Sequence, residues 1–193
     1  MENSKNLRGL RKFVGVFVKR LRKSFWLLRT GFFAPRATFD TITIRGSKPF
    51  LGRIHEALDL LKTRVPETYR LIQNHLVQIL EGIPSGAWVF TLEFQTHTMT
   101  TLSPKVSQEP LVERAATLAH EAYHCALFTN YKASHPGQKV PEQIYGGEQA
   151  ERLCLEYQCE VLKLLGADEE VITRTRQAVE THWWEVPSEE RDW

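Results

Sequence analysis

The stretch Ala119-His120-Glu121-Ala122-Tyr123-His124-Cys125-Ala126 contains the pattern His-Glu-x-x-His, which is the strongest chemical signal in the chain. On an α-helix, residues i and i+4 lie one turn apart on the same face, so His120 and His124 can share one metal ion. Glu121 lies about 100° further round the helix axis, close enough to hold a water molecule beside that ion. The pattern predicts two metal ligands and one general base on a single helix.

The residues on either side of this pattern favour a helix. Residues 111–127 are rich in leucine and alanine, and Pro110 stands where a helix can begin without losing a needed N–H donor. With seven histidines and 23 acidic residues, the pattern is expected by chance roughly 0.03 times in a chain of this length. It therefore needs support from its context. The alternative is a buried helix that carries two ordinary histidines satisfied by hydrogen bonds.

Length, composition and charge indicate one globular domain with an unusual beginning. The chain has 193 residues, 42% of them apolar, which is enough to bury a hydrophobic core. The net charge of +2 conceals an asymmetry, because residues 1–36 carry +9 and the remaining 157 residues carry −7. We therefore expect a basic N-terminal segment, 1–36, followed by an acidic domain, 37–193.

The cysteines and the hydropathy pattern favour a cytoplasmic protein. Three cysteines, without any Cys-x-x-Cys pair, indicate neither a disulfide framework nor a cysteine-rich zinc site. No uncharged apolar run reaches the ~20 residues that a membrane-spanning helix needs.

Residues 8–33 have the pattern of a basic amphipathic helix, with aromatic and aliphatic residues at helical spacing and lysines and arginines between them. Such a helix can lie on an anionic membrane surface, pack against the acidic domain or act as a targeting segment. Peripheral contact with an anionic membrane is therefore one candidate interaction, and nucleic-acid binding is not expected from charge alone.

The remainder of the chain is predicted to alternate between short strands and helices. A strand is expected over 37–44, a hairpin over 87–94 and 97–102, and helices over 51–64, 66–80, 111–131, 148–166 and 169–182. Residues 131–147 form a long loop in this prediction. The aromatic tail, 183–193, is expected to cover apolar surface with Trp183 and Trp184.

A catalytic zinc ion needs about three protein ligands and one open position. The helix predicted over 148–166 offers several carboxylates, of which Glu151 is the first choice and Glu148 the second; His135 and His182 are imidazole alternatives. A di-iron carboxylate site would require a second Glu-x-x-His pattern, and the chain contains none beyond Glu121–His124.

The hairpin, the helix with His-Glu-x-x-His and the later run that begins at Glu151 together resemble the core of zincin metallopeptidases. The resemblance covers roughly residues 86–166 and is closest to the gluzincin type, such as the ImmA/IrrE-like group. It implies that His120, His124 and Glu151 hold one zinc ion, with Glu121 as the general base. It also implies that a peptide substrate pairs with an edge strand. Leu155 stands where several gluzincins have an aspartate that supports a ligand histidine.

The expected fold class is therefore α+β, a mainly helical zincin-like domain with a small antiparallel sheet before the His-Glu-x-x-His helix. The expected function is that of a zinc-dependent metallopeptidase acting on peptide or protein substrates. Tyr145, His135 and His182 are the candidates for stabilising the oxyanion. The alternative function is a non-catalytic binding or regulatory module with the same fold, with or without contact to a membrane surface.

Overall fold

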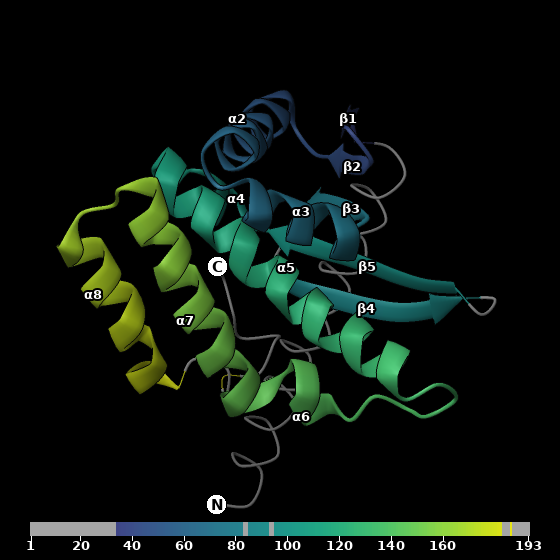
Figure 1. Cartoon of the computed structure of the whole chain (residues 1–193). Coiled ribbons are helices and arrows are strands. Elements are labelled where there is room, and N and C mark those ends of the chain that lie inside the picture. The colour runs from purple at the N-terminus through teal and green to yellow at the C-terminus, as the bar shows by residue number, and fades with distance from the viewer. Residues whose placement is uncertain (1–33, 83–84, 93–94, 183–185, 187–193) are drawn as a thin grey trace, which may run out of the picture.

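The computed structural model describes residues 34–82, 85–92, 95–182 and 186 (Figure 1). The basic segment therefore lies almost entirely outside the described residues, as do Trp183 and Trp184. The strands are β1 (Arg36–Phe39), β2 (Ile42–Arg45), β3 (Gln78–Glu81), β4 (Gly86–Leu92) and β5 (Gln95–Leu102). The helices are α2 (Lys48–Arg64), α3 (Pro66–His75), α4 (Pro104–Ser107), α5 (Leu111–Ser134), α6 (Glu142–Tyr145), α7 (Gly147–Leu165), α8 (Glu169–Gln177) and the 3₁₀ turn η1 (Ala178–Thr181).

The fold is α+β, as expected, but the sheet differs from the prediction. It is small, as expected, with five strands in the order β1-β2-β3-β5-β4, but it is mixed rather than antiparallel. β1 with β2 and β4 with β5 are antiparallel pairs, whereas β2 with β3 and β3 with β5 are parallel. The hairpin β4–β5 before the long helix confirms that part of the prediction, and among the described strands β4 forms one edge of the sheet.

The strand predicted over 37–44 is in fact a hairpin, because the chain reverses at Asp40, whose φ is +47°. Aspartate tolerates this left-handed conformation better than most residues do. Its carboxylate accepts hydrogen bonds from Lys62 Nζ at 2.7 Å and Tyr69 Oη at 2.6 Å, which fix the turn onto α2 and α3. These two donors hold the pKa of Asp40 below its usual value.

The prediction of one helix over 66–80 is also wrong for the residues that follow His75. The helix α3 ends at His75, and residues 78–81 form the central strand β3. A central strand with parallel neighbours is covered on both faces, so its side chains do not alternate between apolar and polar. Ile79 and Leu80 are both buried for this reason. In the sequence, these two adjacent apolar residues fitted the helical pattern that begins at Pro66.

The helix α5 is the centre of the domain. It lies against the sheet near β4 and β5, with α2 and α3 on one side and α7 on the other, and α8 packs on the outside of α7 (Figure 1). Five alanines of α5 are buried, which allows these neighbours to approach its backbone closely: Ala115, Ala116, Ala119, Ala122 and Ala126. Within the described residues, no helix combines the length and the apolar character needed to cross a membrane.

The first turn of α5 is held by a buried arginine. Arg114 is 4% exposed, and its guanidinium donates to the backbone oxygens of Arg53 at 3.1 Å, Ser107 at 3.1 Å and Glu109 at 2.7 Å. It also contacts the carboxylate of Glu56 at 3.4 Å. One side chain therefore joins α2, the end of α4 and the start of α5.

We expect Arg114→Met to lower the free energy of unfolding by about 3 kcal/mol, because it leaves buried carbonyl oxygens without donors. Urea unfolding followed by circular dichroism measures this change. The matched control is Arg70→Met, which removes an exposed ion pair with Glu67 and should change stability by no more than about 0.5 kcal/mol. Equal effects of the two substitutions would contradict the role assigned to Arg114.

Candidate metal centre

The His-Glu-x-x-His pattern lies in the middle of α5, where neighbouring elements bury it. His120 is 4% exposed, Glu121 6% and His124 5%. The Nε2 atoms of the two histidines lie 3.1 Å apart. The i, i+4 spacing has therefore produced the shared direction that the sequence predicted.

The helix α7 brings a third donor to the same point. The Oε2 atom of Glu151 lies 3.4 Å from His120 Nε2 and 3.3 Å from His124 Nε2. Oε2 is buried, and it makes no well-aligned hydrogen bond with the described residues. Burial raises the pKa of Glu151, but the two imidazoles outweigh this effect and lower the pKa to about 2. The carboxylate is therefore ionised and directed at the histidine pair.

These three atoms fit the ligand shell of a small divalent ion. Donors that surround a tetrahedral zinc ion at about 2.0–2.1 Å are separated from one another by ~3.3 Å. The three separations observed here are 3.1, 3.3 and 3.4 Å. A buried carboxylate oxygen without a well-aligned hydrogen bond is also typical of a metal ligand.

The orientation of His124 is fixed by a backbone group. Its Nδ1 atom lies 2.8 Å from the backbone oxygen of Tyr145, so Nδ1 carries the proton and donates it to that oxygen. Such a contact leaves Nε2 as the ligand atom of a neutral imidazole, which is the usual arrangement of a metal-bound histidine. The backbone of α6 therefore holds the imidazole of His124 in place.

The structure adds one residue that the sequence analysis did not include among the ligands. Donor atoms of His120, His124 and Cys154 all lie within 4.8 Å of one another, and these three residues form a group that can bind a metal ion. The spacing Glu151-x-x-Cys154, which puts both side chains on one face of α7, was the signal available in the sequence.

The other predicted site residues lie in different places. Glu148 is exposed and forms an ion pair with Arg152 at 2.7 Å. His135 directly follows α5 and stacks on Tyr131 with ring centroids 4.1 Å apart. His135 is eleven residues beyond His124, or ~16 Å along the helix. His182 follows η1, close enough to Glu148 to lower the pKa of that carboxylate, although Arg152 has the larger effect.

Two cavities meet at Glu121. One has a volume of about 310 Å³ and extends from His120 and Glu121 past Glu109 and Thr117 to α8. The other has about 330 Å³ and extends from His124 and Glu121 to β4 and α6, including Tyr145. The general base predicted from the sequence therefore borders open space on two sides of the motif.

Glu109 lies in the wall of the first cavity and has an unusual pKa. Burial raises the pKa of this carboxyl to about 6, although Thr117 Oγ1 donates a hydrogen bond to it at 3.2 Å. The folded protein thus holds this proton more tightly than the unfolded chain does. Stability is therefore lost as the pH rises from about 4.5 to about 6.

We expect Glu109→Gln to raise the free energy of unfolding at pH 7.5 by about 1–2 kcal/mol, because an amide carries no charge to bury. At pH 4 the variant should match the wild type. Denaturant unfolding at both pH values measures the difference. Glu67→Gln, at an exposed position, should follow the wild type at both, and a gain from Glu109→Gln that is equal at pH 4 and 7.5 would contradict the explanation.

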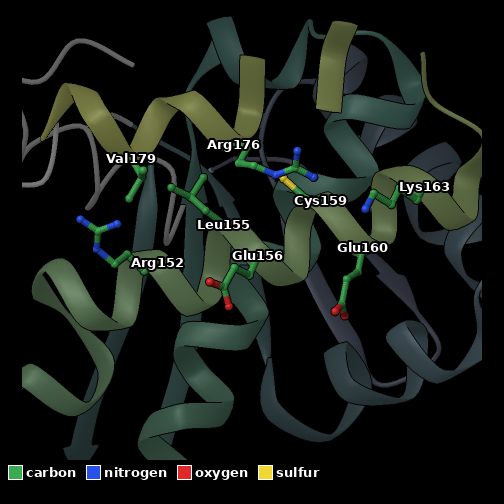
Figure 2. Close-up of a pocket in the computed structure, with 8 residues that line it drawn as sticks. All are labelled: Arg152, Leu155, Glu156, Cys159, Glu160, Lys163, Arg176 and Val179. Carbon is green, nitrogen blue, oxygen red and sulfur yellow. The ribbon is translucent and has the colours of Figure 1, made fainter. Parts of the chain in front are cut away.

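A further cavity of about 380 Å³ lies between α7 and the segment α8–η1 (Figure 2). Its walls carry both signs of charge, and Figure 2 shows the guanidinium of Arg176 beside the sulfur of Cys159. Leu155 is 6% exposed and borders both this cavity and the one beside His120. No residue of the His-Glu-x-x-His motif belongs to the wall of this third cavity.

Comparison of the chain with protein-family models, curated proteins and solved structures finds no match. What the site does is therefore inferred from its own residues.

Proposed function

We propose that this protein is a zinc-dependent metallopeptidase that uses Glu121 as its general base. The observation that carries the proposal is the triangle formed by His120 Nε2, His124 Nε2 and Glu151 Oε2, whose sides match the ligand spacing of a tetrahedral ion. Two imidazoles and one carboxylate, with the next position available to water, are a ligand set of catalytic zinc sites. The carboxylate of Glu121 next to this set supports hydrolysis over simple metal storage.

The roles of the protein groups follow from where they lie. A zinc ion held by His120, His124 and Glu151 would supply Lewis acidity toward water and toward a carbonyl oxygen. Glu121 borders both cavities, so its carboxylate is placed to take a proton from an attacking water and to return it to the leaving nitrogen. Tyr145 is the one of the three oxyanion candidates that lines the second cavity.

An extended peptide is the substrate class that suits the surroundings of the site. β4 is an edge strand among the described strands, and Gly86 and Ala87 at its beginning border the cavity that contains Glu121 and His124. A free strand edge can hold a peptide through backbone hydrogen bonds. The peptide would then pass over the general base.

The alternative proposal is a non-catalytic module whose metal ion only stabilises the fold. Leu155 supports it, because an apolar residue there cannot orient a ligand histidine. The sulfur of Cys154 supports it too, since a fourth protein donor would exclude water. Glu121 argues against it, because a purely structural site does not need a buried carboxylate next to its ligands.

The test is to measure the metal content and the hydrolytic activity of the full chain together. Purified protein should contain about one zinc ion per chain by mass spectrometry and should cleave unfolded protein substrates such as casein. A chelator should remove both the metal and the activity, and added zinc should restore both. Zinc without any cleavage would favour the structural alternative, and the absence of both would contradict the metal site.

A further inference from the structure

We propose that the thiolate of Cys154 is a fourth metal ligand in the resting protein, so that the site is closed to water until this sulfur moves away. The inference rests on the metal site of the proposed function and adds its regulation. It assigns a role to a residue that neither the motif nor the gluzincin resemblance includes.

The position of Cys154 supports this role. It is one turn after Glu151 on α7, on the same buried face, and it is fully buried. Its sulfur lies within 4.8 Å of ligand nitrogens of both His120 and His124. The sulfur thus meets the two histidine nitrogens from α7, as the Glu151 carboxylate oxygen does.

The three cysteines of the chain, all within the described residues, differ in their surroundings. Cys159 is also buried, and its thiol donates a hydrogen bond to the backbone oxygen of Ile172 at 3.7 Å. Cys125 follows His124 directly and is buried in the hydrophobic core. Cys154 is the cysteine that forms a group with the two histidines among the described residues. The sequence thus provides two buried cysteines as internal controls.

Four protein donors change what the site can do. Tetrahedral zinc sites with four protein ligands are structural, whereas catalytic sites keep one position for water. A thiolate is a strong zinc ligand, so water near Glu121 would reach the metal only after Cys154 is displaced. Any event that moves α7 or modifies this thiol would then open the site.

Cobalt substitution tests the ligand set without relying on activity. Full-length protein loaded with one Co²⁺ should show an intense near-ultraviolet thiolate-to-cobalt charge-transfer band. Cys154→Ser should lose this band and still bind cobalt, whereas Cys125→Ser and Cys159→Ser should keep it. X-ray absorption of the wild-type zinc protein should show one sulfur at about 2.3 Å beside nitrogen and oxygen ligands, and this measurement does not depend on how any variant folds.

The outcomes separate this inference from the proposed function. Wild-type protein that binds one cobalt without the charge-transfer band and shows no zinc–sulfur distance would overturn the role of Cys154 and leave the His120–His124–Glu151 site intact. Wild-type protein that binds neither metal would overturn the metal site itself. Loss of the band in Cys125→Ser with retention in Cys154→Ser would show that Cys125 supplies the sulfur ligand, and it would overturn the role of Cys154.

Discussion

Glu121→Gln should reduce the rate of peptide hydrolysis by roughly 10³-fold while the protein still binds one zinc ion. Removal of a general base costs typically 10²–10⁴ in rate, and glutamine has nearly the shape of glutamate without its ability to accept a proton. Glu121 does not belong to the set of three donor atoms, so the metal content should not change. The loss should appear mainly in kcat, because the amide still occupies the same place between the two cavities.

A matched control is available in the same cavity. Glu142 borders the space that contains Glu121 and His124, but it lies on α6 and is exposed. Glu142→Gln makes the same chemical change there and should leave kcat within about twofold. Steady-state hydrolysis of one peptide by all three proteins, with zinc measured in each, checks the prediction. Equal losses in both variants, or a loss of zinc from Glu121→Gln, would contradict the assignment of Glu121 as the base.

The parts of the site that could be predicted are those set by local helix geometry. His120 and His124 share a direction because four residues make about one turn, and no knowledge of the fold is needed for that. Glu151 could also be predicted as the third ligand, because it lies near the start of a strongly periodic helix and places its carboxylate on the apolar face. Cys154 was missed because its own spacing to any other cysteine carries no metal signature, and its proximity to His124 depends on how α5 and α7 pack.

The errors in the predicted fold also arise from contacts between residues far apart in the sequence. β3 depends on its neighbours β2 and β5, and burial on both faces removes the alternation that distinguishes a strand from a helix. The turn at Asp40 lacks glycine, and it is held by Lys62 and Tyr69 from distant helices. Both features are decided by contacts far apart in the sequence. Local patterns therefore located the His-Glu-x-x-His helix correctly and failed where long-range pairing determines the structure.

Glu151→Gln is expected to weaken zinc binding by on the order of 100- to 1000-fold. A structural zinc ion contributes about 10–16 kcal/mol over four ligands, or ~3 kcal/mol for each, and the substitution replaces an anionic ligand by a neutral amide. The two histidines remain, so binding should weaken rather than disappear. Competition with a coloured zinc chelator measures the affinity, and circular dichroism checks that the helices are intact.

The decisive comparison is with Glu148→Gln, three residues earlier on the same helix. Glu148 was the second candidate for the third ligand, and in the structure its carboxylate pairs with Arg152 at the surface instead. Its replacement should leave zinc affinity within about twofold, since an exposed ion pair contributes little. If Glu148→Gln weakened binding as much as Glu151→Gln, the carboxylate that faces His120 and His124 would not be the ligand. If neither did, the site would be held by the histidines and Cys154 alone, and the case for a catalytic rather than a structural ion would weaken with it.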